Sequence, residues 1–219
     1  MELERGDQRI RLVWCIKGLI SEKDRITKEI ERFKPDMVAL PISPEEMTGL
    51  GACVNRKVKE IALSNLETIF AKKMEAFGKV TVPSPFLAQA YILAKKQKIK
   101  LKPLDLDEEA FTDFYVKTVS TPDLIIHSMR CRNLQKKRFK AKNPKDFSLE
   151  WDAIVSRTGG LKAVERLRET TMARNILLIP KDYKRVLALV EVERYEGVKA
   201  HLQSGLDGAK DALDMRGAR

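Results

Sequence analysis

The stretch 185–197 carries the residue types in this chain that are best suited to chemistry. An unbroken apolar run at 186–190 is followed within four residues by Glu191, Glu193 and Arg194. Such a run is typical of a strand that is covered on both faces in an α/β sheet. Open α/β sheets bind their ligands at the carboxyl ends of the strands. The sequence therefore predicts a charged site at the end of this strand.

Three further charged side chains are predicted to reach the same place. Lys17 follows the predicted strand 9–16, Asp105 follows the predicted strand 99–104, and Arg168 lies on the helix before the last strand. Because the carboxyl ends of parallel strands share one edge of a sheet, we expect these side chains to converge. The predicted ligand-binding residues are Lys17, Asp105, Arg168, Glu191, Glu193 and Arg194.

A cluster of Lys, Asp, Glu and Arg permits three interpretations. It is an ion-pair network that fixes the sheet edge, or it binds an anion through its Lys and Arg side chains. In the third interpretation Glu191 or Glu193 is the base of a hydrolase, because acidic neighbours raise the pKa of a carboxyl group. The sequence offers no Gly-rich phosphate loop and no Ser–His–Asp system beside the cluster.

The most basic part of the chain is 130–145, which contains eight Lys or Arg residues and no acid. Such charges release counterions from a nucleic-acid backbone and give salt-dependent binding. Only Phe139 and Phe147 could stack on bases, so a solvated helix end and loop is the competing interpretation. The candidate nucleic-acid-binding residues are Arg130, Arg132, Lys136, Lys137, Arg138, Lys140 and Lys142.

Length and composition restrict the class of protein. The chain has 219 residues, of which 43% are hydrophobic and 33% are charged, and this is typical of a packed α/β domain. Its net charge of +11 favours an anionic partner. Three widely spaced cysteines and two histidines predict a reducing cytoplasmic location and no metal site. There is neither a signal-peptide core nor a membrane-length apolar run, so we expect no membrane partner.

Strand and helix patterns alternate along the chain. Strands are predicted at 9–16, 37–42 and 99–104, and a fourth predicted strand begins the stretch 185–197. Helix starts are indicated by Ser or Asp followed by Pro or acidic residues, and continuous helical spacing extends over 55–77. For the helix that begins near residue 121, the predicted inner face consists of Leu124, Ile125, Met129, Cys131 and Leu134.

This order predicts an α/β fold with a mostly parallel or mixed central sheet and helices on both faces. A large helical block at about 107–178 separates the third and last core strands. We expect residues 1–204 to form a single α/β domain and 205–219 to form a C-terminal tail.

The order of elements resembles the TraB family, in the group that includes the Tiki proteins, ChaN and the erythromycin esterases. The resemblance spans most of residues 9–200. Residues 35–38 match the family's Pro-Asp-x-Val block, and 103–107 resemble its Leu-Ile-Asp-Arg-Asp block. Arg168 fits the Glu-Arg-Asp-x-x-Met-Ala block, and Gly197 fits the closing Gly-x-Gly-His-x-x-Gly segment.

Three functional positions of that family carry other residues here. Lys17 and Arg194 stand at the histidine positions of its two Gly-x-x-His motifs, and Pro41 stands at the position of a strand glutamate. In the family those residues are tied to metal binding and hydrolysis. The resemblance therefore implies a divergent, archaeal-type member with a rebuilt site and without metal-dependent hydrolysis.

We therefore expect a ligand-binding or regulatory protein rather than an enzyme, with a charged strand-end cleft that takes a small anionic ligand or a peptide. Nucleic-acid association through 130–145 and hydrolysis with Glu191 or Glu193 as base are the alternatives. No cofactor is expected, and the sequence is compatible with an oligomer.

Overall fold

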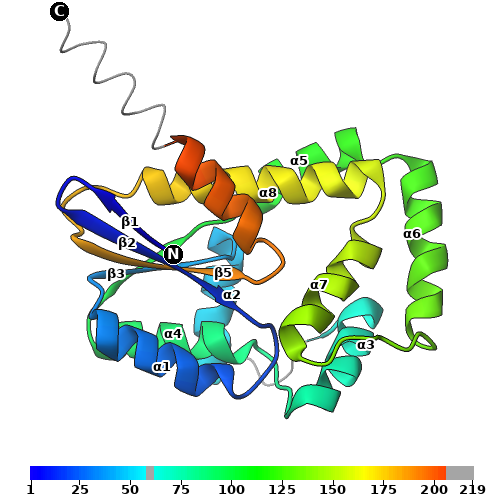
Figure 1. Ribbon diagram of the computed structural model, residues 1–219, viewed down its shortest axis with the longest axis horizontal. Helices are drawn as coiled ribbons and strands as arrows, with labels where there is room; N and C mark the ends of the chain where they lie inside the picture. Colours follow the sequence, from blue (N-terminus) through cyan, green and yellow to red (C-terminus); the bar gives the residue numbers. More distant parts are fainter. Residues whose placement is uncertain (58–61, 206–219) are drawn as a thin grey trace, which may run out of the picture.

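The computed structural model describes residues 1–57 and 62–205, and within them one five-stranded sheet has the order β1-β2-β5-β3-β4 (Figure 1). Strands β2, β5, β3 and β4 run parallel, and β1 pairs antiparallel with β2. The predicted α/β fold with a mixed sheet is confirmed. The strands are β1 (Glu2–Arg5), β2 (Gln8–Cys15), β3 (Met37–Leu40), β4 (Lys100–Pro103) and β5 (Arg185–Glu191).

The burial of each strand follows its place in the sheet. All of β3 is buried, and β5 is buried from Val186 onward, because both strands lie inside the sheet with helices on both faces. The edge strand β1 alternates between exposed and half-buried residues. Strand β1 was not predicted from the sequence, because three of its four residues are charged. A turn at Gly6, whose φ of 66° suits glycine, pairs β1 with β2.

Helices cover both faces of the sheet (Figure 1). On one face lie α1 (Glu22–Phe33), α2 (Pro44–Val54) and α4 (Pro85–Lys96), and they pack on Leu187 and Leu189. On the other face lie α8 (Gly159–Leu177) and the last helix, 195–205, which pack on Val186 and Val190. These two apolar layers hold the carboxyl ends of the parallel strands in fixed relative positions.

A third apolar cluster lies beyond the carboxyl ends of the strands, at the right of Figure 1. It joins Ile16 and Val192 to the aromatic rings of Phe70, Phe147 and Trp151. The helices around it are α3 (Asn65–Met74), the 3-10 helix η1 (Glu75–Phe77), α6 (Thr121–Leu134) and α7 (Pro144–Val155). With α5 (Glu108–Thr118), which packs on α8, helices α5 to α8 correspond to the helical block predicted at about 107–178.

The prediction of a single helix over 55–77 is wrong. Helix α2 ends at Val54, residues 58–61 lie outside the described residues, and α3 begins at Asn65. Ser64 and Glu67 form a capping box, in which each side chain accepts a hydrogen bond from the other residue's backbone N–H. This local start signal outweighs the continuous helical spacing around it. Of the predicted tail 205–219, residues 206–219 also lie outside the described residues.

The predicted inner face of α6 is also largely wrong. Only Leu134 of that face is fully buried, while His127 and Cys131 turn toward α7, with His127 Nδ1 3.2 Å from the carbonyl oxygen of Val155. Apolar residues surround most of this helix, so their spacing did not define one inner face. The side chains that are exposed instead are Leu124 (42%), Ile125 (56%) and Met129 (54%).

Candidate functional site

A cleft of about 600 Å³ opens at the carboxyl edge of the parallel strands. One residue from the end of each parallel strand reaches it: Lys17 after β2, Pro41 after β3, Asp105 after β4 and Glu191 at the end of β5. The size lies in the range of small-molecule sites. The apolar part of the wall comes from the surrounding helices and loops and includes Leu63, Phe70, Val80, Leu87 and Phe111.

Ion pairs connect the polar residues of this cleft. The Arg168 guanidinium donates from Nε and Nη2 to Asp105 Oδ2, at 2.8 and 2.6 Å, and its Nη1 lies 3.1 Å from Glu165. Lys17 Nζ lies 2.9 Å from Glu191 Oε1, and Arg168 Nη2 lies 3.8 Å from the other oxygen of Glu191. The structure therefore brings together four of the predicted site residues, and each cation among them already has carboxylate partners.

Arg194 lies deeper and is only 6% exposed. Its guanidinium contacts Glu169 at 3.0 Å, Glu165 at 3.3 Å and also Asp152. Gly197 leaves room for this arrangement, because a Cβ atom there would overlap the Glu169 carboxylate. Arg194 therefore belongs to a saturated ion-pair network, which is one of the interpretations that the sequence left open.

Glu191 and Glu193 have opposite electrostatic environments. Burial by itself raises the pKa of Glu191, but Lys17 and Arg168 outweigh burial and lower this pKa below its ordinary value. Burial dominates at Glu193 and raises its pKa, with Glu191 and Asp152 acting in the same direction and Lys17 opposing them. Of the two glutamates predicted as a catalytic base, only Glu193 has the raised pKa that suits acid–base chemistry.

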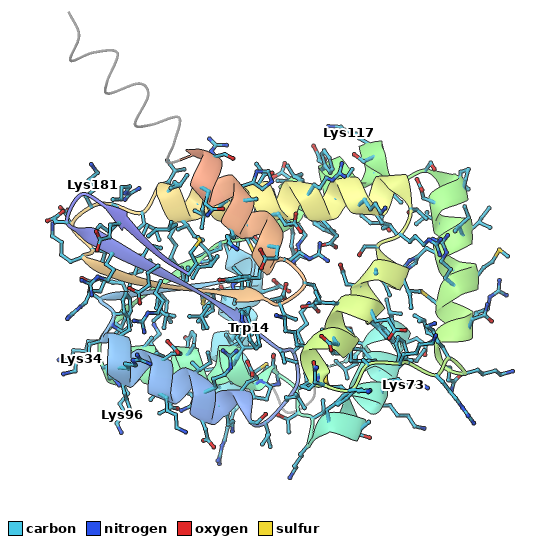
Figure 2. The ribbon with its side chains drawn as sticks, in the orientation of Figure 1. Trp14, Lys34, Lys73, Lys96, Lys117 and Lys181 are labelled. Carbon is cyan, nitrogen blue, oxygen red and sulfur yellow. The ribbon has the colours of Figure 1, made fainter. Side chains whose placement is uncertain are left out.

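The cleft is acidic although the protein is basic. Among the described residues, six carboxylates and two cations line it: Glu46, Glu67, Asp105, Glu108, Glu165 and Glu191 against Lys17 and Arg168. The whole chain, in contrast, has a net charge of +11. Figure 2 shows the labelled lysines Lys34, Lys96, Lys117 and Lys181 at the periphery of the molecule. The charge of the described cleft lining is therefore opposite in sign to the net charge of the chain.

Several residues of the site were missed by sequence reasoning. On α8, the acids Glu165 and Glu169 flank Arg168 at helical spacing and lie beside the buried residue Met172. Charged residues that recur at helical spacing on the same face as a buried apolar residue are a sequence signal that could have identified these two acids. Asp152 on α7 carries no comparable signal. Glu46 and Glu67 are the third residues of their helices. A glutamate at this position is explained by helix capping, so the sequence gives no reason to assign it to a binding site.

The basic segment 130–145 lies apart from the residues that line the cleft. It covers the end of α6 and the loop to α7, and within the described residues only Lys137 forms an ion pair there, with Glu150 at 3.8 Å. Lys73 of α3 donates a hydrogen bond to the Lys137 carbonyl oxygen and adds its charge to this surface. The segment's exposed residues without an ion pair in the described part of the chain include Arg132, Lys136, Arg138, Lys140 and Lys142.

No protein-family model matches this chain, and no curated protein matches it. Across residues 1–57 and 62–205, no three His, Cys, Asp or Glu side chains are grouped so that they could hold a metal ion. The same residues contain no helix that is long and apolar enough to cross a membrane. Function is therefore argued from the cleft itself.

Proposed function

We propose that this protein binds a small organic cation with an apolar portion in the strand-end cleft. The observation that carries this proposal is the excess of carboxylates over cations in the cleft of a positively charged protein. The sequence had favoured an anionic ligand or a peptide through Lys17, Arg168 and Arg194. An anion would have to compete with carboxylates that already contact these three cations.

The apolar wall supports a ligand with a hydrocarbon portion. Phe70, Leu87 and Phe111 offer surface that a bare inorganic cation would leave unused. The Oε2 atoms of Glu46 and Glu67 each accept a hydrogen bond from a backbone N–H. Neither residue forms an ion pair in the described part of the chain. These two carboxylates can therefore attract an amino group without losing a cation partner.

A series of three compounds with the same six-carbon tail tests the charge of the ligand. We expect hexylamine to raise the melting temperature at low ionic strength, and hexanol and hexanoate to leave it unchanged. Calorimetric titration then measures the affinity for hexylamine. Stabilisation by hexanoate and not by hexylamine would support the anionic ligand that the sequence predicted and would contradict this proposal.

A matched pair of variants locates the binding. Glu46→Gln removes a charge from the cleft but keeps an oxygen for the capping box with Ser43. We expect it to weaken hexylamine binding about two- to five-fold, the effect of one partly solvated charge pair. Glu45→Gln removes a neighbouring exposed charge outside the cleft and is the control. Equal effects of the two variants would place the amine elsewhere.

We also propose that the chain is a divergent relative of the TraB family and that it is cytoplasmic. Support for the first comes from Lys17 and Arg194, which stand at the family's two histidine positions and line one common cavity. Support for the second comes from three free cysteines. Determining the structure of a TraB protein that retains both histidines would test the relationship, because the two histidines should occupy the places of Lys17 and Arg194.

A further inference from the structure

A smaller chamber of about 220 Å³ continues inward from the cleft. The two cavities share six lining residues, so they adjoin: Lys17, Glu67, Phe70, Glu165, Arg168 and Glu191. Beyond these shared residues, the chamber is lined by α3 and α7 and by the segment that follows β5. An elongated ligand that enters the cleft can therefore extend past the Lys17–Glu191 pair.

The chamber also has an excess of acids. In the part of the chain that the structure describes, five carboxylates line it, from Glu67, Asp152, Glu165, Glu191 and Glu193, against the three cations Lys17, Arg168 and Arg194. Each of these cations contacts at least one carboxylate, and Arg194 contacts three. Every cation of the chamber among residues 1–57 and 62–205 therefore has a carboxylate partner.

Within the described residues these pairs leave out two of the five carboxylates, Glu67 and Glu193, and Glu67 already accepts hydrogen bonds from Ser64 at the start of α3. Glu193 forms no ion pair in this part of the chain, and its Oε2 is buried without a hydrogen-bond partner. A buried carboxylate oxygen without a partner is costly for a folded protein. The charged groups around Glu193 are Lys17 after β2, Glu191 of β5 and Asp152 of α7. A positively charged group that enters the chamber would supply the missing partner.

We propose that the natural ligand is a linear aliphatic diamine or polyamine, which places one amino group in the cleft and a second one beside Glu193 in the chamber. This inference rests on the proposed function, since it assumes that the cleft binds an amine. The apolar side chains of Phe70, Leu66 and Val155 line the chamber and suit the hydrocarbon chain between the two charges. The specificity of the site is then for the number and the spacing of positive charges.

The protonation of Glu193 should make the binding of the second amino group depend on pH. Burial and the neighbouring acids keep the pKa of Glu193 above its ordinary value, so the unliganded carboxyl group retains its proton to a higher pH. An ammonium group binds the ionised form, and binding therefore releases a proton. We expect diamine affinity to rise with pH through the titration of Glu193, and monoamine affinity to follow this rise much less.

Calorimetric titration with hexylamine and with diamines of four to ten carbons tests the inference at low salt. In the wild-type protein we expect the best diamine to bind at least about ten-fold tighter than hexylamine, the gain of one charge-assisted contact. In Glu193→Gln we expect this gain to fall to about two-fold or less. Glu196→Gln is the control, because it removes an exposed charge that pairs with Lys199 outside both cavities.

The outcomes separate this inference from the proposed function. If hexylamine binds and no diamine binds tighter, the second charge subsite is wrong and the cation-binding cleft remains. If neither kind of amine binds, the proposed function fails as well. If Glu193→Gln and Glu196→Gln reduce the diamine gain equally, the effect is long-range and Glu193 is not the anchor.

Discussion

Glu191 and Glu193 show how one intervening residue separates two roles. Glu191 ends strand β5 between Lys17 and Arg168, and its carboxylate is held in the ionised form. Glu193 lies in the turn beyond the strand and has no such partner in the described structure. The first glutamate pairs with two cations at the sheet edge, and the second one is the proposed partner of a ligand's amino group.

Glu193→Gln should reveal this difference in stability. The pKa of Glu193 in the folded protein is raised above its ordinary value of 4.5. The protonated side chain therefore makes its whole contribution to the free energy of unfolding at pH values below 4.5. The contribution is lost as pH rises through the raised pKa, since the folded state then must bury a charge. Glutamine mimics the protonated form and avoids this loss.

We therefore expect Glu193→Gln to have a higher free energy of unfolding than the wild type at neutral pH, with a difference that grows as pH rises above 4.5 and becomes constant above the raised pKa. Urea unfolding at several pH values measures it, and Glu196→Gln should show no such trend. A variant that is less stable by a constant amount at every pH would contradict the buried, proton-binding state of Glu193.

The start of α8 shows how an element is positioned. Gly160 lies against the junction of α5 and α6, where a Cβ atom would come within 2.7 Å of the Thr118 carbonyl oxygen and 2.9 Å of Val119 Cα. It would also come within 2.8 Å of Asp123, whose carboxylate caps α6 with Ser120. The close approach of backbones fixes the end of the helix that carries Glu165 and Arg168 into the site.

Two neighbouring glycines provide a matched test of this packing. Gly160→Ala should destabilise the protein by about 1–3 kcal/mol, because backbone atoms must move to admit the methyl group. A Cβ atom at Gly159 would have no neighbour within 4 Å, so Gly159→Ala should change the free energy of unfolding by less than about 0.5 kcal/mol. Chemical denaturation of both variants measures the difference, and equal losses would show that the contact at Gly160 does not hold α8 in place.

At the scale of the whole molecule, the cleft and the chain differ in the sign of their charge. The described residues that line the cleft include more carboxylates than cations, whereas the chain has a net charge of +11 and its basic segment 130–145 lies outside the cleft. A basic surface outside the cleft leaves nucleic-acid association open as a prediction, independent of the cation site. The two activities can be separated because they use different residues.

The double variant Lys136→Glu, Lys140→Glu tests that prediction. If the segment contacts the phosphate backbone, the variant should weaken binding to duplex DNA and RNA and reduce the slope of log affinity against log salt by roughly 1 to 2. The control, Lys96→Glu with Lys181→Glu, makes the same charge change elsewhere on the surface (Figure 2). Fluorescence anisotropy at several salt concentrations measures both. No salt-dependent binding by the wild type would remove this candidate function.

The sequence by itself determined the parallel core of the sheet and the meeting of charged residues at its edge. Apolar runs such as 186–190 identify buried strands, and parallel strands place their carboxyl ends together. Lys17, Asp105 and Glu191 could therefore be assigned to one site in advance. Ser or Asp followed by Pro or acidic residues likewise indicated helix starts, and Ser43 and Asp107 cap α2 and α5 in the structure.

Only the tertiary structure decided which charges are already paired, and hence the sign of the site. Residues distant in sequence supply the partners: Asp152, Glu165 and Glu169 surround Arg194, and no local pattern encodes that contact. The exposure of Ile125 on α6 likewise depends on the neighbours that the fold gives that helix. Local propensity and periodicity fix elements and edges, whereas the compensation of buried charge is a property of the packed chain.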